Sequence, residues 1–472
     1  MKPRRYPPWE FMLLVDEVNY SLSEQLAVQH RLGEPIVNIS SGVSYYPTFN
    51  LLLQEVARAI DCPSFHQDYD GPEGHPMGRR AIQTHEYFLS RHGLDLSDEH
   101  VLITAGASTA MHLLSLYFAE VYPDAEILVP VPTFPLAGAS MAFAGLSVRE
   151  VFHRREGRLL PTLLDYQAAL GERTRLLFLN IFNNPSGECY EEQELTEIIR
   201  WSKQVGLISI IDKVSIDMVQ GTEVPNVLDI AYEQNYLDHL IIVSSLSKDR
   251  CLPGFRIGWI IASPKLITEL ARYNALISVC PAAPTTALLF MDMLCRTVMS
   301  VGSQSQGETP DRVAIARMFV ERALTFAPLA PGLADFLKPY MDPRYLNTLF
   351  GCFADWHAEL MDLLQRNWRL ITDDLAGCFV IGAPWRGGFN TFVRMPSLDQ
   401  VDPYHFTVSL FRQRGIQILP GPSFGGTLAD WRSQYGFWIR LSFAMETAKL
   451  NAGLERLVSF AQEYKAQTPQ QQ

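Results

Sequence analysis

The stretch Val243-Ser-Ser-Leu-Ser-Lys248-Asp-Arg-Cys-Leu-Pro-Gly254-Phe-Arg256-Ile-Gly258 decides which fold and which chemistry the sequence predicts. The apolar run Leu240-Ile-Ile-Val243 reads as a buried strand that ends at a cluster of hydroxyl groups. Lys248 follows this strand, and partial burial there lowers the pKa of an amine and makes it a candidate for imine formation. Ser245 and the planar guanidinium of Arg256 can together hold a phosphate. For an isolated Ser-x-x-Lys pattern the ordinary alternative is a surface lysine after a strand.

The composition is that of a folded protein with a large core. The chain has 472 residues, 47% of them hydrophobic, and this length predicts two or three lobes. Its net charge of −12 argues against nucleic acid or an anionic membrane as the main partner. Its 7 scattered cysteines contain no Cys-x-x-Cys pair, which is typical of a reducing compartment and predicts neither a disulfide framework nor a metal site. Without a signal-type leader or a long apolar run, the sequence predicts a cytoplasmic protein with no membrane partner.

Strands and helices alternate through the middle of the chain. Strands are expected near 101–104, 126–131, 175–180, 207–211 and 240–243, and helices near 81–91, 109–121, 191–205, 264–277 and 285–299. This alternation predicts a doubly wound α/β domain with a mostly parallel sheet. In such sheets, ligands bind at the carboxyl ends of the strands.

Further helices and strands are expected toward the two ends of the chain. An amphipathic helix is expected over 10–32, because Leu14, Val18, Leu22 and Leu26 recur at every fourth position. The last part of the chain predicts a helix, three strands and a closing helix, near 356–375, 388–394, 415–421, 437–443 and 450–464.

Several residues with chemical potential follow the predicted strands directly. The turn that holds Ala107 and Ser108 leads into a helix, and backbone N–H groups at a helix start can cradle a phosphate. Phe134 can lie against a ring, Asn184 can donate or accept hydrogen bonds, and Asp212 needs a partner because a buried charge is costly. The ordinary alternatives are a packing turn, a core phenylalanine, an Asn-Pro turn and a structural arginine beside the aspartate. Their common position at the edge that also holds the lysine is stronger evidence than any one motif.

Three further candidates come from other parts of the chain. Gly42 ends a short extended segment and lets a ligand approach the backbone closely. Tyr69 lies in an open loop rich in glycine and proline. Arg440 lies inside an apolar strand, which is costly unless it meets an anion. An ordinary loop glycine, a structural tyrosine and a structural salt bridge are the alternatives.

In combination, these residues resemble the class I/II aminotransferases, which are pyridoxal-phosphate enzymes of fold type I. The resemblance covers roughly 36–300 and 350–460, and the intervals of 28, 36 and 8 residues between Asn184, Asp212, Lys248 and Arg256 are similar to those of the family. It implies an α/β fold with a large, mostly parallel sheet domain and a smaller α/β C-terminal domain. The implied units are an N-terminal arm with part of the small domain, a large cofactor-binding domain, an insertion and the C-terminal small domain, at 1–49, 50–300, 301–345 and 346–472.

The resemblance also implies roles for the candidate residues in binding pyridoxal 5'-phosphate. Lys248 would form the internal aldimine and carry a proton, while Asp212 would keep the ring nitrogen protonated. Asn184 would bond the ring's 3-oxygen and Phe134 would stack on the ring. The phosphate would be bound by the remaining cofactor residues, which are Ala107, Ser108, Ser245, Arg256 and, from a neighbouring subunit, Tyr69.

The implied activity is transamination of an α-amino acid, with a keto acid as the second substrate. Arg440 would clamp the substrate's α-carboxylate, with Gly42 and Asn184 nearby. A tyrosine that reaches the neighbouring subunit implies a homodimer with shared active sites. The insertion at 301–345 is expected to form a lid or to enlarge the dimer interface.

Two positions depart from the family pattern. Ser215 stands where the family usually has a tyrosine that donates to the ring oxygen, and this change predicts a raised imine pKa. Gly42-Val-Ser44 replaces the usual Gly-x-Pro, so the substrate contacts there stay open.

Other functions on the same scaffold have to be weighed. The segments around Tyr69 and Lys248 are also similar to aminocyclopropane-carboxylate synthase, which favours as an alternative a lyase or cyclase acting on S-adenosylmethionine or another amino acid in a specialised biosynthetic pathway. A pyridoxal-binding regulator is disfavoured because only about 35 residues precede the matching region, too few for a DNA-binding head. A catalytically inactive homologue is disfavoured because the lysine, the aspartate and both arginines are present.

Overall fold

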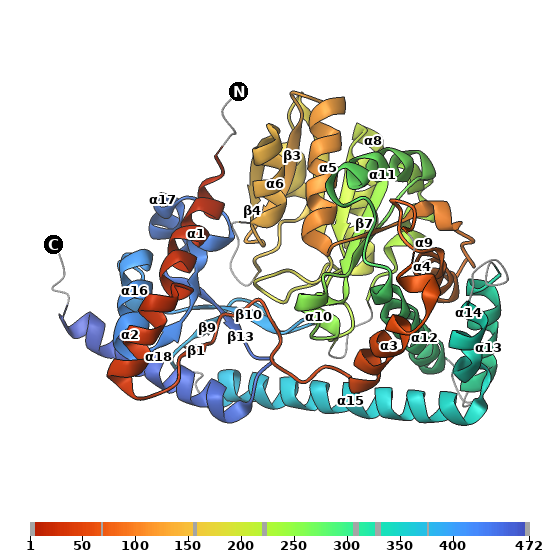
Figure 1. Cartoon of the computed structure of the whole chain (residues 1–472). Coiled ribbons are helices and arrows are strands. Elements are labelled where there is room, and N and C mark those ends of the chain that lie inside the picture. Colours follow the sequence, from red (N-terminus) through yellow and green to blue (C-terminus); the bar gives the residue numbers. More distant parts are fainter. Residues whose placement is uncertain are drawn as a thin grey trace.

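The computed structural model describes residues 5–67, 69–153, 158–219, 224–304, 311–325, 332–374 and 377–467 (Figure 1). Parts of the predicted insertion, 305–310 and 326–331, lie outside the described residues. Within the described ranges, every helix falls short of the length or the apolar character that a membrane-spanning segment needs.

A seven-stranded sheet forms the centre of the larger part of the molecule. Its strand order is β2 (Val101–Thr104), β8 (Gly258–Ile261), β7 (Leu240–Ser245), β6 (Ile208–Asp212), β5 (Thr174–Asn180), β3 (Glu126–Val131) and β4 (Ser147–Phe152). Only β8 runs antiparallel to its neighbours, and the other pairs are parallel. The predicted α/β class with a mostly parallel sheet is therefore confirmed. The register aligns Asn180 with Asp212, and Asp212 with Val243, along one edge.

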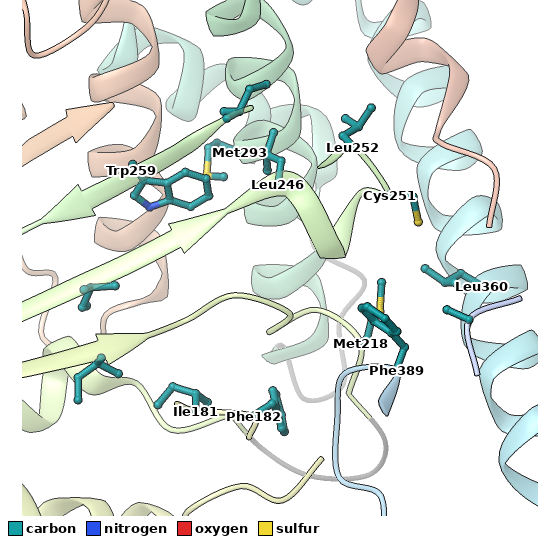
Figure 2. Packing of buried hydrophobic residues seen from close by; sticks show 14 of the residues in the cluster. Ile181, Phe182, Met218, Leu246, Cys251, Leu252, Trp259, Met293, Leu360 and Phe389 are labelled. Atoms are coloured by element: carbon teal, nitrogen blue, oxygen red, sulfur yellow. The ribbon is translucent and has the colours of Figure 1, made fainter. Parts of the chain in front are cut away.

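Helices cover both faces of this sheet because its strands are apolar on both sides. Alternate residues of a strand point to opposite faces, and Ile210 and Ile241 accordingly join one buried cluster while Ile211 and Ile242 join another. The first cluster contains residues of α5 (Ala107–Val121), α6 (Leu136–Ala144) and α11 (Pro264–Ser278). The second contains residues of α4 (Pro76–Leu89), α8 (Glu192–Val205), α9 (Val227–Glu233) and α12 (Pro284–Gln304), and Figure 2 shows its packing near the carboxyl ends of the strands.

A smaller, antiparallel sheet is built mainly from the end of the chain. Its order is β12 (Leu419–Pro420), β13 (Trp438–Ser442), β10 (Asn390–Arg394) and β9 (Val380–Ile381). Beside it, β1 (Val37–Asn38) pairs in parallel with β11 (Ile416–Gln417), next to α16 (Pro403–Arg414) and α18 (Thr447–Gln467). The N-terminal segment is thereby joined to elements that lie almost 400 residues later in the sequence. The long helix α15 (Pro343–Arg369) runs along the base of the molecule toward α18 (Figure 1).

The prediction of a single helix over 10–32 is wrong. The segment forms α1 (Pro7–Asn19) and α2 (Leu22–Leu32), because Ser21 leaves helical geometry and its side chain accepts a hydrogen bond from the backbone N–H of Glu24. Leu14, Leu22 and Leu26 of the apolar stripe are exposed, Leu22 by 70%. This stripe therefore does not pack against the core of its own chain.

The described part of the insertion forms a helical layer on the outside of the larger unit. It contains α13 (Arg312–Ala323) and α14 (Leu333–Leu337), and α13 packs against α4, α12 and α15. Helix α15 begins at Pro343, well before the predicted start at 356, because Pro343 stands at its first turn and Asp342 caps it. The buried Tyr340 connects this layer to α3 (Asn50–Ile60) through a hydrogen bond to Glu55.

Candidate active site

The carboxyl ends of β5, β6 and β7 open into a cavity of about 260 Å³. Nine of the eleven residues selected from the sequence line it, namely Gly42, Ala107, Ser108, Phe134, Asn184, Asp212, Ser245, Lys248 and Arg256. Arg440 lies behind these lining residues, and its side chain donates a hydrogen bond to one of them, Asn184. Tyr69 is 79% exposed and does not belong to the lining. None of the lining residues comes from 301–345, so the described part of the insertion forms no lid over this cavity.

Lys248 lies on α10 (Leu246–Asp249), a single helical turn that follows β7 directly. Its Nζ donates a hydrogen bond to the backbone carbonyl of Gly42. Burial lowers the pKa of this amine to about 8, helped by the positive charges of Arg440 and Arg256 and opposed by Asp212. An appreciable fraction of the amine is therefore uncharged and nucleophilic near neutral pH.

Asp212 is the last residue of β6, and each of its two carboxyl oxygens accepts a hydrogen bond. One carboxyl oxygen accepts from the backbone N–H of Val214 at 2.8 Å, and the other accepts from Asn180 Nδ2 at 2.9 Å. The Oδ1 atom of Asn180 in turn accepts from the hydroxyl of Thr133 at 2.7 Å. Burial raises the pKa of Asp212 to about 6 in spite of these hydrogen bonds and of Lys248. Such a carboxylate gains most from a cationic partner, and a protonated ring nitrogen is one.

Asn180 and Thr133 were not selected from the sequence. Asn180 is the last residue of an apolar strand, which is the same signal that selected Asp212. Thr133 follows β3, and no pattern in the sequence links it to Asn180. The two side chains fix the orientation of the Asp212 carboxylate.

The raised pKa of Asp212 predicts how this residue affects stability. A carboxyl group that binds its proton more tightly in the folded state makes the free energy of unfolding fall as pH rises from about 4 to about 6. In the cofactor-free protein, Asp212→Asn removes this penalty and should raise the free energy of unfolding at pH 7.5 by about 1–3 kcal/mol. The difference should vanish below about pH 4, where both forms are uncharged.

Urea unfolding of the cofactor-free variant at both pH values measures this effect. The exposed Asp124→Asn is the matched control, since it removes an aspartate without removing a buried charge. Equal or lower stability of Asp212→Asn at pH 7.5 would contradict the prediction.

A cradle lined by Ala107, Ser108, Ser245 and Arg256 forms another part of the cavity wall. Gly106 precedes α5 with a φ of 82°, and a Cβ atom at this position would lie 2.7 Å from Nη2 of Arg256. A Cβ atom on Gly258 would lie 2.5 Å from the carbonyl carbon of Gly106. The start of α5 and Arg256 can approach one another only because both positions lack a side chain. Helix N–H groups, a guanidinium and the hydroxyl of Ser245 at one place form a site that fits a phosphate.

Arg440 is a buried cation that forms no ion pair with any residue in the described ranges. Its side chain is 2% exposed, its Nη1 donates to Asn184 Oδ1 at 3.0 Å and its Nη2 donates to the carbonyl of Ser40. No carboxylate lies within ion-pair distance among the residues that the structure describes, and Nε has no acceptor there. Burial lowers the pKa of Arg440 to about 10. This surrounding fits the carboxylate of a ligand better than the structural salt bridge that was the alternative.

Ser215 and Ser44 occupy the two positions that depart from the family pattern. Ser215 lines the cavity in a left-handed backbone conformation with a φ of 71°. Ser44 is buried and accepts hydrogen bonds from Cys251 Sγ and from the backbone N–H of Tyr46. It therefore ties the loop after Gly42 to the segment that follows Lys248.

A buried charge network below Lys248 was also missed by the sequence reasoning. Arg250 bonds Asp292 and Asp217, and Arg296 bonds Asp292, Asp217 and Asp249. The network connects the lysine turn to α12 and to the segment after Asp212. No sequence spacing predicts it, because its members come from three separate segments of the chain.

Comparison with known proteins identifies the family. The family model described as aminotransferase class I and II matches residues 34–293, which is more than half of the chain. Nicotianamine aminotransferase 1 from Oryza sativa subsp. japonica is 24% identical over 96% of this chain and 80% of that protein. Aspartate aminotransferase from Thermotoga maritima is 25% identical over 52% of this chain, and the match spans 62% of that enzyme.

Solved structures show the same fold. An aromatic aminotransferase from Pyrococcus horikoshii aligns with a TM-score of 0.69 at 19% identity, over 94% of this chain and all of that one. The predicted fold type I architecture is thereby confirmed. With a family model matched across the cavity residues from Gly42 to Arg256, the chain belongs to the aminotransferase class I and II family.

Proposed function

We propose that this protein is a pyridoxal-phosphate-dependent aminotransferase that acts on an α-amino acid and a keto acid. The observation that carries the proposal is that Lys248, Asp212 and the cradle residues Ala107, Ser108, Ser245 and Arg256 line one cavity. The family uses pyridoxal phosphate, and the names of the family model and of the two relatives described above support transamination over the lyase or cyclase alternative.

The residues of the cavity fit this cofactor from its phosphate to its ring. In the proposal, its phosphate is bound by the backbone of Ala107 and Ser108 and by the side chains of Ser245 and Arg256. Phe134, which lines the cavity, would cover one face of the ring. Asp212 would pair with the ring nitrogen, and Asn180 holds that carboxylate in place through a hydrogen bond. When bound, pyridoxal phosphate supplies an electron sink for the bond broken at the substrate's α-carbon.

The chain itself supplies the attachment point and the proton transfer. Lys248 would hold the cofactor through its side-chain amine. With a pKa of about 8, its free Nζ could take the proton from the substrate's α-carbon and deliver it to the cofactor's C4′ carbon. Arg440 and Asn184 orient the substrate through its carboxylate. The Oδ1 atom of Asn184 accepts from Arg440, which leaves the amide NH2 group to donate toward the ring or the substrate.

A homodimer with shared active sites is part of the proposal. Tyr69 is exposed on its loop, where it can reach the phosphate site of a second copy. Leu276, Ile277 and Val279 form an exposed apolar group at the end of α11, and Leu276 is 86% exposed. An apolar surface of this kind is typical of an interface.

The proposal also includes the cellular compartment of the protein and the boundaries of its domains. All seven cysteines are free thiols, which supports a reducing compartment such as the cytoplasm. The proposed units are the arm at 1–49, the cofactor domain at 50–300, the insertion at 301–345 and the small domain at 346–472.

A single-turnover experiment tests the proposed activity. Cofactor-loaded enzyme is mixed with a panel of amino acids and with S-adenosylmethionine, and the visible spectrum and the products are recorded. Transamination predicts loss of the yellow colour, formation of pyridoxamine phosphate and release of one keto acid per site. Release of ammonia or of a cyclised product without pyridoxamine phosphate would overturn the proposal in favour of a lyase or cyclase.

Ser215 predicts a difference in the colour of the resting enzyme. Its short side chain cannot place a hydroxyl where the family's usual tyrosine stabilises the ring oxygen. The pH at which the cofactor's visible band titrates should therefore be higher than in relatives with tyrosine. A spectrophotometric pH titration measures it, and a low value typical of those relatives would contradict the prediction.

A further inference from the structure

In loop 40–42, which follows β1, three successive backbone carbonyls each accept a hydrogen bond from a side chain. The first carbonyl accepts from Arg440 Nη2, and the third accepts from Lys248 Nζ. The second, that of Ser41, accepts from the hydroxyl of Ser442. The arginine and the lysine belong to the proposed site, and Ser442 is the third donor.

Ser442 holds this loop where the backbone pairing beside β13 is interrupted. The N–H of Ser442 donates to the Ile39 carbonyl at 2.8 Å, and the N–H of Tyr45 donates to the Ala444 carbonyl at 2.8 Å. Between these two bonds, no backbone hydrogen bond within the described part of the chain links residues 40–44 to the strand. The guanidinium of the site and the Ser442 hydroxyl bridge this gap instead.

Ser442 is itself held by the neighbouring strand β10. It is paired with Asn390 in the antiparallel register, and its Oγ lies 2.6 Å from Asn390 Oδ1. Ser442 is 1% exposed and is not among the described residues that line the cavity. A buried hydroxyl with partners on two other segments has one preferred orientation. It can therefore hold the loop in the same position with or without a ligand in the cavity.

The loop brings a second carboxylate-binding group close to Arg440. Gly42 lines the cavity, and its backbone N–H forms no hydrogen bond with any residue that the structure describes. A Cβ atom at Gly42 would lie 3.7 Å from Arg440 Nη2, so the backbone there runs close to the guanidinium. A carboxylate has two oxygens, and two donors this close together can bind the same carboxylate. The spacing of these donors depends on where the loop is held.

We propose that Ser442 is a positioning residue for substrate recognition. Its hydroxyl holds loop 40–42 against the strand that carries Arg440, and this sets the spacing of the guanidinium and the Gly42 N–H for one α-carboxylate. Ser442 acts through these two groups and does not touch the substrate. The inference rests on the proposed function, because it concerns the carboxylate of the proposed amino-acid substrate.

Binding of two unreactive ligands tests this inference without turnover. Pentanoate carries the carboxylate, and pentanamide is a neutral counterpart of the same size. Neither contains an amine, so neither can condense with the cofactor. Dissociation constants are measured by NMR titration on the cofactor-loaded full chain, in the wild type, Ser442→Ala and Ser442→Cys. The control is Ser115→Ala, which removes an equally buried hydroxyl that donates within its own helix, α5.

Ser442→Ala should weaken the binding of pentanoate by about three- to tenfold, the effect of one buried hydrogen bond, and that of pentanamide by less than about twofold. Ser442→Cys keeps a weak donor of similar size, so its affinity for pentanoate should lie between the two. Ser115→Ala should bind both ligands as the wild type does. An equal loss for both ligands would overturn the inference, because it would indicate a general change of the cavity. Unchanged binding of pentanoate in Ser442→Ala would also overturn it.

A double-mutant cycle shows whether Ser442 acts through Arg440. Single-turnover titration with an amino acid gives the rate constant at limiting substrate for Ser442→Ala, Arg440→Met and the double variant. If the hydroxyl works by aligning the loop with the guanidinium, its loss should cost less than about twofold once Arg440 is replaced. Losses that multiply in the double variant would show that the two residues act independently, and the inference would then be wrong.

The binding and turnover measurements separate this inference from the proposed function. If amino acids yield pyridoxamine phosphate while Ser442→Ala binds pentanoate as the wild type does, the inference fails and the aminotransferase proposal stands. If Ser442→Ala selectively loses pentanoate but no amino acid yields pyridoxamine phosphate, the aminotransferase proposal fails, and the role of Ser442 in carboxylate binding stands.

Discussion

Lys248→Ala is expected to lose covalent retention of the cofactor and to reduce kcat by a factor on the order of 10⁴ or more. The reason is that one amine is proposed for two tasks, attachment of the cofactor and proton transfer at the substrate's α-carbon. Lys248 is the one lysine among the described residues that line the cavity. Its environment also differs from that of Lys213, the nearest lysine along the chain from Asp212. The Nζ of Lys213 donates to Glu86 at 3.0 Å in a buried ion pair, so this amine already has a carboxylate partner.

Reduction with borohydride followed by peptide mass spectrometry measures the attachment directly. The wild type should carry a pyridoxyl group on the peptide that contains Lys248, and Lys248→Ala should carry none. Lys248→Arg keeps a positive charge but supplies no imine-forming amine, so it should be as inactive as the alanine variant. The exposed Lys265→Ala should behave as the wild type. A pyridoxyl group found on another lysine in wild-type protein would contradict the assignment of Lys248 as the attachment point.

The sequence predicted the central sheet and the position of the site because both follow from local patterns. The runs at β5, β6 and β7 are continuous and apolar, and their ends are marked by Asn180, Asp212 and Ser245. Since parallel strands end at the same edge of a sheet, residues that directly follow them come together whatever the loops between them do. This is why Asp212 and Lys248, 36 residues apart, could be assigned to one cavity before the structure was known.

What the sequence did not predict depends on pairings between distant segments. The hydrogen bond from Thr133 to Asn180 joins residues 47 positions apart, and the contact between Arg440 and Ser40 joins residues 400 apart. No spacing or periodicity contains this information. The single-helix prediction failed for a different reason. The apolar spacing of Leu14 and Leu22 continues through the break at Ser21, although these side chains are exposed.

Arg440 shows how such a distant pairing determines chemistry. From the sequence, Arg440 was a charged residue within an apolar strand, and either an anionic ligand or a structural salt bridge could explain it. In the structure the guanidinium lies above the ring of Phe424 at 5.1 Å. Among the described residues its hydrogen-bond acceptors are all neutral, namely Asn184 and the carbonyl of Ser40. A buried cation with neutral partners alone destabilises the fold, so its presence argues for a ligand that supplies the missing negative charge.

Arg440→Ala is therefore expected to lower kcat/KM for an α-amino acid by about 30- to 5,000-fold, equivalent to roughly 2–5 kcal/mol of recognition. The loss has two parts, because the variant removes the partner of the substrate's carboxylate and leaves Asn184 Oδ1 without its donor. Single-turnover titration with the best amino acid of the panel measures it. The control is Arg432→Ala, an exposed arginine paired with Asp402, whose loss should change little.

Arg440→Met separates recognition from stability. Methionine fills much of the same space without a charge, and replacing a buried charge by an apolar side chain is often neutral or stabilising. This variant should unfold at the same or a higher urea concentration than the wild type, while its kcat/KM falls as far as that of Arg440→Ala. A variant that binds the amino acid with wild-type affinity would show that Arg440 does not hold the substrate. A variant that loses stability together with activity would assign to Arg440 a structural role that its neutral partners do not suggest. The expected outcome is a stable protein that no longer recognises its substrate. It follows only if the buried guanidinium binds a ligand and does not stabilise the fold.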